Sequence, residues 1–281
     1  MSVLIKGKEL SEKIVENIAQ EVKNYEKKPG LTVIIVGDNP ASRVYVNKKK
    51  TTAEKAGFNS AVIELPEDVS QQELETHIDV LNKEDTVDGI LVQLPLPKHI
   101  STYDILERIK PEKDVDGFHP INVGRLVIGL KPYAVSCTPF GIIKLLEENN
   151  IEIEGKHAVV IGRSNIVGKP VASLLLNRNA TVTVCHSKTA SLRRICMQAD
   201  ILVAAVGIAK FVKADWVKPG AVVIDVGINR TEEGKLVGDV DFEEVSKKAG
   251  YITPVPGGVG PMTIAMLLAN TLELFKLHNN L

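Results

Sequence analysis

Hydrophobic residues follow two patterns along the chain, periodic in some stretches and in short unbroken runs in others. The first periodic stretch predicts an amphipathic helix, whose apolar face carries Leu10, Ile14, Ile18 and Val22. Unbroken apolar runs predict buried strands, at residues 31–37, 60–65 and 89–94. Helices are expected between them, over residues 40–56 and over 70–82, where Ser70 and Glu73 form a capping box. This alternation is typical of an α/β fold.

The second half of the chain repeats the alternation at the spacing of βαβ units, which predicts a parallel, Rossmann-like sheet. Its strands are expected at residues 158–161, 181–185, 201–206 and 221–226. One helix is expected over 139–148, with Thr138 as its cap, and a last one over 262–277. We therefore expect two domains with a cleft between them, formed by residues 1–138 with 263–281 and by residues 139–262.

Composition limits the classes of function that fit. A chain of 281 residues with 44% hydrophobic and 25% charged residues suits two ordered domains. A net charge of −1, with few aromatics, gives little support for binding nucleic acid or an anionic membrane, so a small-molecule substrate is expected. The amino terminus lacks a secretion signal and the three cysteines form no CxxC motif, which favours the cytoplasm.

A glycine-bearing turn follows the strand predicted at 158–161, within K-H-A-V-V-I-G-R-S-N-I-V-G-K-P. Gly162 permits a sharp turn, and Gly168 lets the next helix pack closely, so that unpaired amides face a pyrophosphate. The pattern G-x-S-x-x-x-G departs from G-x-G-x-x-G, and a plain turn is the alternative. An NAD site usually carries an acid about twenty residues later, but Ser187 and its neighbours include none. With Arg163 beside the turn, we expect NADP rather than NAD.

A helical face with Ser42, Tyr45 and Lys49 is a candidate pocket wall. Desolvation disfavours a charged lysine there and suits it to proton transfer, although a solvated basic face is the alternative. Gln93 stands at the carboxyl end of a predicted strand, where open sheets place ligand groups; a satisfied buried amide is the alternative. Asp116 lies in the segment D-V-D-G, whose two acids could bind a cation or a donor-rich ring, although spacing alone favours an Asx turn.

The segment P-V-P-G-G-V-G-P-M-T from Pro254 combines rigidity with close backbone approach, which favours a ligand-facing loop over a linker. Scattered histidines and the lack of a cysteine cluster predict no metal site. The sequence also lacks the G-x-S-x-G elbow of serine hydrolases and a P-loop lysine.

Taken together, these motifs resemble those of the bifunctional methylenetetrahydrofolate dehydrogenase/cyclohydrolase (FolD) family along essentially the whole chain. The matching segments are V-G-D-N-P-A-S-R-V-Y-V, Q-L-P-L-P, K-D-V-D-G, C-T-P-F-G, G-R-S-N-I-V-G-K-P and P-V-P-G-G-V-G-P-M-T. The resemblance implies oxidation of 5,10-methylenetetrahydrofolate with NADP, followed by hydrolysis of the methenyl product to 10-formyltetrahydrofolate. It also implies a homodimer.

The resemblance further implies a role for each motif residue. Lys49 would be the main catalytic group, hydrogen-bonded by Gln93, with Tyr45 against the folate ring and Asp116 at the donor edge of the pterin. The cofactor would meet Gly162, Arg163 and Ser164 at its pyrophosphate and ribose, Ser187 near the ribose phosphate and Ile228 near the nicotinamide. The loop with Pro256, Gly257 and Gly258 would border the folate.

Two positions depart from the family pattern. Thr51 replaces a second lysine, which leaves the balance between the two activities open. Ser136 replaces a proline, which is expected to relax the backbone there without affecting the chemistry. Three alternatives remain: a monofunctional methylenetetrahydrofolate dehydrogenase, a nucleotide-binding scaffold without activity, and a hydroxy-acid or shikimate-type dehydrogenase.

Overall fold

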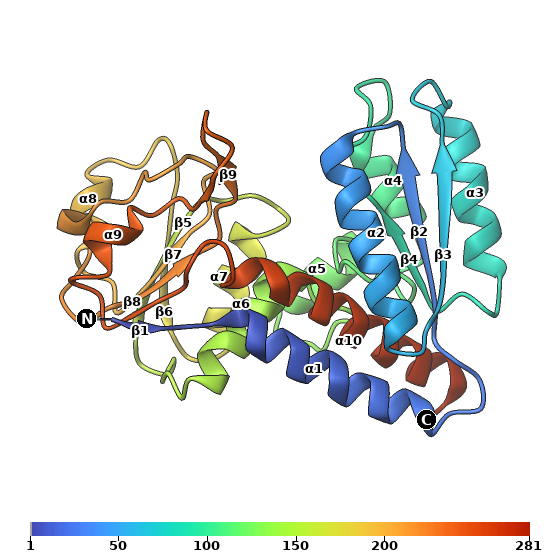
Figure 1. Ribbon diagram of the computed structural model, residues 1–281, viewed down its shortest axis with the longest axis horizontal. Helices are drawn as coiled ribbons and strands as arrows, with labels where there is room; N and C mark the ends of the chain where they lie inside the picture. Colours follow the sequence, from blue (N-terminus) through green and yellow to red (C-terminus); the bar gives the residue numbers. More distant parts are fainter. Residues whose placement is uncertain (1) are drawn as a thin grey trace. The chain divides into compact units, whose positions relative to one another are not determined.

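The computed structural model describes residues 2–281, which form two compact units (Figure 1). Unit 1 contains the residues up to Glu12 together with Ser136–Met266. Unit 2 contains Lys13–Val135 and Leu267–Leu281. Two unit boundaries fall inside helices, because α1 spans Gly7–Lys23 and α10 spans Val259–Asn279.

Unit 2 is built on a three-stranded parallel sheet in the order β3-β2-β4. Its strands are β2 (Gly30–Val36), β3 (Asn59–Leu65) and β4 (Gly89–Val92). Its remaining helices are α2 (Pro40–Lys55), α3 (Gln71–Lys83), α4 (Thr102–Arg108) and α5 (Pro120–Val127). Helices α2 and α3 flank strands β2 and β3 (Figure 1). The central strand β2 is buried throughout, and Ile34 packs with Leu74 of α3 and Ile105 of α4.

The strand order of unit 2 creates a switch point between β2 and β4, because the chain goes from β2 to one neighbour and later returns to the other. Residues just beyond Val36 and Val92 therefore lie at the edge where open α/β sheets bind ligands. The predicted site residue Gln93 directly follows β4, and its backbone amide donates to the Ile34 carbonyl at 2.8 Å.

Unit 1 contains a six-stranded, entirely parallel sheet in the order β1-β11-β8-β7-β5-β6. The strands are β1 (Val3–Leu4), β5 (His157–Ile161), β6 (Thr181–Cys185), β7 (Ile201–Ala204), β8 (Val222–Asp225) and β11 (Tyr251–Ile252). A separate antiparallel hairpin joins β9 (Asn229–Arg230) and β10 (Leu236–Val237).

Helices cover this sheet and complete its apolar core. Helix α7 (Gly168–Leu176) packs on β5 and β6 and against α6 (Cys137–Glu148). A second cluster joins Val159, Leu202 and Val223 of the sheet to α8, η1 and α9. These elements span Leu192–Cys196, Ala214–Trp216 and Phe242–Val245. Covered parallel strands of this kind read as continuous apolar runs, which is why they were visible in the sequence.

The expected α/β architecture is confirmed, with two differences of detail. Residues up to Glu12 belong to unit 1 rather than to the N-terminal domain, because β1 pairs in parallel with β11. We expected Thr138 to cap α6, but it does not. The helix begins at Cys137, Ser136 occupies the cap position without a side-chain cap bond, and the Thr138 hydroxyl instead bonds that of Thr263 at 3.1 Å.

Candidate functional site

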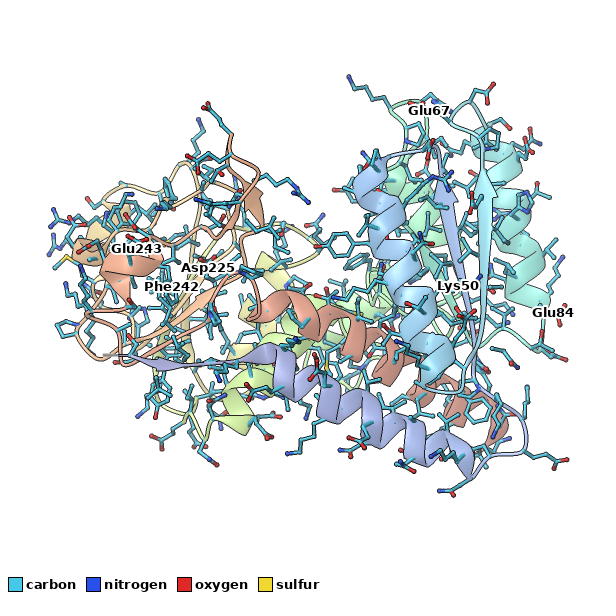
Figure 2. The ribbon with its side chains drawn as sticks, in the orientation of Figure 1. Lys50, Glu67, Glu84, Asp225, Phe242 and Glu243 are labelled. Atoms are coloured by element: carbon cyan, nitrogen blue, oxygen red, sulfur yellow. The ribbon has the colours of Figure 1, made fainter. Side chains whose placement is uncertain are left out.

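Lys49 lies in the buried face of α2 in unit 2. Its residue is 8% exposed, whereas the neighbouring Lys48 is exposed and Lys50 (labelled in Figure 2) is intermediate. The Lys49 Nζ donates to the Gln93 Oε1 at 2.9 Å, so the hydrogen bond expected between these residues is present. A solvated basic face therefore describes Lys48 but not Lys49.

Gln93 is held by both ends of its amide. Its Nε2 donates to the Leu94 carbonyl at 2.7 Å, and this bond leaves Oε1 directed at the lysine. Because the backbone of Gln93 is also bonded to β2, the acceptor facing Lys49 has little freedom to turn away. The arrangement fixes a primary amine at the sheet edge where ligands bind.

Tyr45 lies one helical turn before Lys49 and differs from its neighbours in exposure. Ser42 is 8% exposed, whereas Tyr45 is 42% exposed. The structure thus buries two members of the predicted face and leaves the phenol ring accessible. An accessible ring beside a buried amine suits stacking on a planar ligand.

The two acids of the D-V-D-G segment have different surroundings. Asp114 is buried, and its Oδ2 accepts from the His119 amide at 2.8 Å and from Asn122 Nδ2 at 2.9 Å. Burial raises the pKa of the Asp114 carboxyl. Asp116 is only partly buried. Asp114 therefore stabilises the loop and leaves Asp116 as the acid better placed to meet a ligand.

Two asparagines that the sequence did not single out support the same loop. Asn122 Oδ1 accepts from the Tyr133 amide at 3.0 Å, in addition to the contact with Asp114. Asn270, buried in α10, donates to the carbonyls of Val115 and Val135, each at 2.8 Å. The asparagine side chain within the apolar run of α10 was a signal from which a buried hydrogen bond to this loop could have been predicted.

The predicted glycine turn of unit 1 needs both of its glycines. Gly162 has a φ of 116°, and a Cβ there would lie 2.1 Å from the Ala205 carbonyl oxygen. A Cβ at Gly168 would lie 2.3 Å from the carbonyl oxygen of Gly162. Since Ala205 follows β7 and Gly162 follows β5, the turn occupies the switch point of the six-stranded sheet.

The amides at the start of α7 are not unpaired, contrary to the prediction. The Ser164 Oγ accepts from the amides of Val167 and Gly168, each at 3.2 Å. The side chains of Arg163 and Ser164 are exposed on the same turn. A serine hydroxyl in the third position of the motif thus satisfies donors that we had assigned to a phosphate.

The other predicted cofactor residues lie after neighbouring strands of unit 1. Ser187 is exposed beyond β6, in a segment that contains no carboxylate from His186 to Ala190. Ile228, which is 50% exposed, follows β8, and a Cβ on Gly260 would lie 3.6 Å from its Cδ1. These residues and the glycine turn line the carboxyl edge of one sheet.

The proline-glycine loop has a packing role at its predicted site residues. The Gly257 carbonyl accepts from the amides of Gly7 and Lys8 at 2.9 and 3.1 Å, and Gly257 has a φ of 104°. Pro256, Gly257 and Gly258 lie in unit 1, where the loop leads into α10 at Val259. Gly257 is thus required by its positive φ, and the close approach of α1 depends on Gly7, where a Cβ would lie 1.9 Å from the Gly258 carbonyl oxygen.

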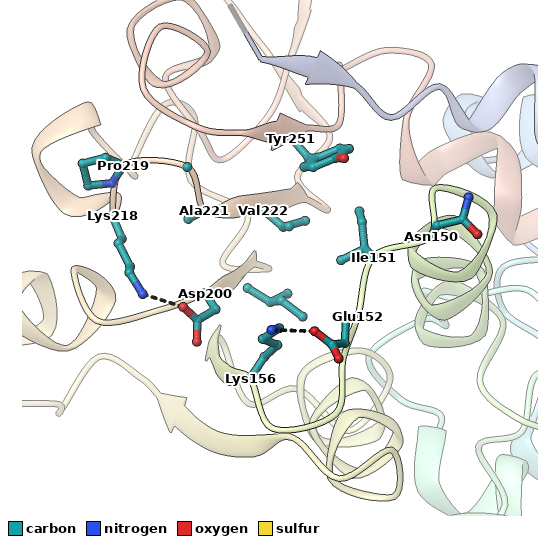
Figure 3. Close-up of a pocket in the computed structure, with 12 residues that line it drawn as sticks. Asn150, Ile151, Glu152, Lys156, Asp200, Lys218, Pro219, Ala221, Val222 and Tyr251 are labelled. Atoms are coloured by element: carbon teal, nitrogen blue, oxygen red, sulfur yellow. Dashed lines mark hydrogen bonds and ion pairs between the residues drawn. The ribbon is translucent and has the colours of Figure 1, made fainter.

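A pocket of about 410 Å³ lies at the amino ends of the unit 1 strands, at the edge opposite to the glycine turn (Figure 3). Its rim carries two ion pairs, Lys156 with Glu152 at 2.7 Å and Lys218 with Asp200 at 2.5 Å. Its charged groups are thus already paired, and none of the predicted site residues lines it. We do not assign it to the chemistry.

Metal ligands and membrane spans were searched for over residues 2–281. That part of the chain contains no group of three His, Cys, Asp or Glu side chains arranged to hold a metal ion. It also contains no helix with the length and apolar character needed to cross a bilayer.

Family models identify both parts of the chain. The catalytic domain of tetrahydrofolate dehydrogenase/cyclohydrolase matches residues 5–116, and the NAD(P)-binding domain of the same proteins matches residues 136–279. The chain belongs to the tetrahydrofolate dehydrogenase/cyclohydrolase family. It is a bifunctional enzyme acting on tetrahydrofolate derivatives, with a nicotinamide dinucleotide as cofactor.

Individual relatives match this family member over its whole length. The bifunctional protein FolD of Listeria innocua is 58% identical over 279 residues, which is 98% of each chain. The crystal structure of bifunctional FolD from Campylobacter jejuni is 55% identical, covers 100% of both chains and has a TM-score of 0.97. The Trypanosoma brucei FolD structure, complexed with NADP and an inhibitor, is 44% identical with a TM-score of 0.95 and covers 100% of this chain and 99% of that one. These likenesses favour the bifunctional interpretation over a monofunctional dehydrogenase.

Proposed function

We propose that unit 2 binds the folate and carries out the proton transfers, while the carboxyl edge of the unit 1 sheet binds NADP. This division follows the predicted domains, 1–138 with 263–281 and 139–262, except that unit 1 also takes in the residues up to Glu12, 136–138 and 263–266. The observation that carries the proposal is the buried Lys49, whose ammonium donates to Gln93 at 2.9 Å.

Lys49 is proposed to serve the cyclohydrolase step. Addition of water to the methenyl carbon releases a proton, and ring opening requires a proton on the departing nitrogen. An amine near the folate carbon can transfer both protons. General acid–base catalysis of this kind typically accelerates a reaction roughly 10²- to 10⁴-fold. Gln93 orients the amine, because its oxygen accepts a hydrogen bond from Nζ and holds the nitrogen in place beside β4.

Tyr45 and Asp116 are proposed to position the folate. The accessible ring of Tyr45 would stack on the reduced pterin or its neighbouring ring. The pterin edge carries an amino group and ring nitrogens, which are donors that a carboxylate accepts. Asp116 suits this role because it is only partly buried and because Asp114, Asn122 and Asn270 hold the segment that carries it.

Unit 1 is proposed to hold NADP rather than NAD, as the sequence predicts. When bound, the dinucleotide accepts the hydride from the methylene carbon, so the protein's contribution to this step is chiefly alignment. Gly162 and Gly168 let the backbone approach the pyrophosphate, and Arg163 and Ser164 lie exposed beside them. Ser187 would face the ribose phosphate in a segment without acids, and Ile228 the nicotinamide.

The folate border and the cellular setting complete the proposal. Pro256, Gly257 and Gly258 would border the folate, in addition to the packing of Gly257 on α1. A cytoplasmic location agrees with three buried thiols that form no disulfides within residues 2–281. A homodimer is proposed from the family resemblance.

Parallel assays of the two half-reactions test the proposal. We expect the parent enzyme to reduce NADP in the presence of methylenetetrahydrofolate with a higher kcat/KM than NAD, and to hydrolyse methenyltetrahydrofolate without a dinucleotide. Arg163→Glu should raise the KM for NADP more than that for NAD, because only NADP carries the 2′-phosphate that the arginine attracts. The same charge reversal at the exposed Lys247 should change neither constant. Equal effects of Arg163→Glu on NADP and NAD would contradict the cofactor assignment.

A further inference from the structure

Two buried carboxylates of unit 1 have no part in the proposed chemistry. Asp225 ends β8 and is 2% exposed (labelled in Figure 2), and Asp239 is 0% exposed. Neither has a basic side chain among its hydrogen-bond partners. Buried carboxylates are costly unless their oxygens are satisfied, so the groups that satisfy them indicate what they stabilise.

Asp239 gathers four donors from two separate loops. Its Oδ2 accepts from the amides of Val206 and Gly207 at 2.6 and 2.9 Å. Its Oδ1 accepts from the Ile208 amide at 3.0 Å and from Asn229 Nδ2 at 2.9 Å. Three consecutive backbone amides therefore point at one side chain, an arrangement that fixes the conformation of a loop from within.

Asp225 fixes the backbone of Asp239 itself. Its Oδ1 accepts from the amides of Gly227 and Asp239 at 3.0 and 2.8 Å, and its Oδ2 accepts from the Val240 amide at 3.0 Å. A Cβ at Gly227 would lie 2.2 Å from Asp239 Oδ1, and one at Gly238 would lie 1.8 Å from Asp225 Oδ2. The glycines are thus needed for the two backbones to approach the carboxylates.

The loops that these carboxylates hold adjoin the nucleotide turn. Residues 205–208 follow β7 and residues 226–229 follow β8, and the sheet order places β7 between β8 and β5. Ala205 supplies the carbonyl against which Gly162 packs. Ile208 and Ile228 project from the two loops with exposures of 53% and 50%. Asp239 therefore joins the two loops that carry apolar side chains beside the turn.

We infer that Asp239 is a positioning residue for the dehydrogenase step, which holds the 206–208 loop and Asn229 in the arrangement that receives the nicotinamide half of the dinucleotide. Asp225 acts indirectly, because its carboxylate accepts from the backbone amides of Asp239 and Val240 and so fixes the position of Asp239. The inference rests on the proposed binding of NADP at this edge. It assigns Asp239 no contact with substrate or cofactor, so its effect must be transmitted through the loops.

The decisive variant is Asp239→Asn, which keeps the volume but turns an NH₂ group towards amide donors. Hydrogen bonds to a charged acceptor are strong enough that we expect the NADP dissociation constant and KM to rise roughly 10- to 100-fold. Dehydrogenase kcat should fall as well, because hydride transfer depends on alignment. The KM for methylenetetrahydrofolate and the cyclohydrolase rate without dinucleotide should stay within about twofold of the parent, since unit 2 is untouched.

The matched control is Asp241→Asn, two residues further along. Its carboxylate pairs with the exposed Lys213 at 3.0 Å and holds neither loop, so all constants should remain parental. Asn229→Ala is a milder second variant, which removes one of the four donors while leaving the amide contacts of Asp239 intact. It should raise the NADP dissociation constant roughly two- to fivefold, and it decides the question if Asp239→Asn does not fold.

Parental NADP affinity and parental dehydrogenase kcat in Asp239→Asn would overturn the inference. So would an equal loss of both activities in the folded variant, because that result indicates general damage rather than loop positioning. With no folded Asp239→Asn protein, parental constants in Asn229→Ala would overturn it. A parent enzyme that does not reduce NADP would instead contradict the proposed function.

Discussion

Ser136 shows how a single side chain connects a helix cap to the nucleotide turn. Its residue is 1% exposed, and its hydroxyl donates to the Ile166 carbonyl at 2.6 Å, within the turn between Gly162 and Gly168. The proline expected at this position from the family pattern has no donor that could make this bond. From the sequence we expected this substitution only to relax the backbone. The structure shows that the serine also forms a hydrogen bond to the nucleotide turn.

Ser136→Ala should weaken NADP binding modestly. Loss of one buried hydrogen bond of about 1 kcal/mol predicts a rise in the NADP KM of roughly two- to fivefold, with cyclohydrolase activity unchanged. Ser173→Ala is the control, because that hydroxyl bonds only the Lys169 carbonyl within its own helix. Steady-state kinetics of both variants test this, and an unchanged NADP KM in Ser136→Ala would contradict it.

At the residue scale, the sequence indicated some local features and left others open. The sharp turn at Gly162 was expected from the glycine itself, and its φ of 116° agrees. The contact of Lys49 with Gln93 was expected only from the family resemblance, because the residues alone equally allowed a solvated lysine and a satisfied amide. The supporting residues Asp114, Asn122, Asn270 and Asp239 were not assigned these roles. Their partners are backbone groups distant in the sequence, and one sequence does not record such pairings.

At the scale of elements, the glycine turn and α7 act as one piece. The first residue of α7 lies against the carbonyl of Gly162, and the Ser164 hydroxyl accepts from the amides of Val167 and Gly168. The position of the helix start therefore depends on the absence of a side chain at Gly168.

Gly168→Ala should damage the nucleotide turn. The added Cβ would meet the Gly162 carbonyl oxygen at 2.3 Å and Arg163 Cα at 2.8 Å, both of which are backbone atoms. Overpacking of this kind costs about 1–3 kcal/mol, so the NADP dissociation constant should rise roughly tenfold or more. Gly124→Ala, in helix α5 with nothing within 4 Å of the added Cβ, should leave it unchanged. Equal NADP affinity in both variants, measured by titration, would show that the contact is unimportant.

Long apolar elements were predictable, and short ones were not. Strands β2 and β5 match the expected runs to within a residue, because buried parallel strands are apolar nearly throughout. Strands β1 and β11 are two residues each, and β1 is exposed, so their sequences carry no periodic signal. Only their pairing across about 250 positions of the chain creates them.

At the scale of the whole molecule, that pairing also determines how the chain is divided. Residues up to Glu12 join unit 1 through β1, so the polypeptide enters unit 2 within α1 and leaves it again at Ser136. Helix α10 is then divided between the units at Met266 and Leu267. The sequence predicted two domains but did not indicate the pairing of β1 with β11, because a two-residue strand has no recognisable pattern.

Stability should depend on pH through the buried acid of unit 1. Burial raises the pKa of Asp225 from 3.8 to about 6, so the folded state favours the protonated form. Its stabilising contribution is complete below about pH 4 and is lost as the pH rises through about 6, which lowers the free energy of unfolding by about 3 kcal/mol. Urea denaturation of the dinucleotide-free enzyme at several pH values measures this loss.

Asp225→Asn provides the comparison, because it cannot titrate. The difference in unfolding free energy between parent and variant should shrink as the pH rises between about 4 and 6, whereas contributions from surface ion pairs cancel. A difference that does not vary with pH would exclude Asp225 as the titrating group.

The most direct test of the account concerns Lys49, because the proposed folate chemistry depends on its amine. Lys49→Gln should lower methenyltetrahydrofolate hydrolysis at least about 100-fold while leaving the NADP dissociation constant unchanged. Lys48→Gln removes the same charge one position earlier on an exposed side chain and should retain the parental rate. Hydrolysis by Lys49→Gln at the parental rate would contradict the assignment of Lys49 as the group that transfers the proton.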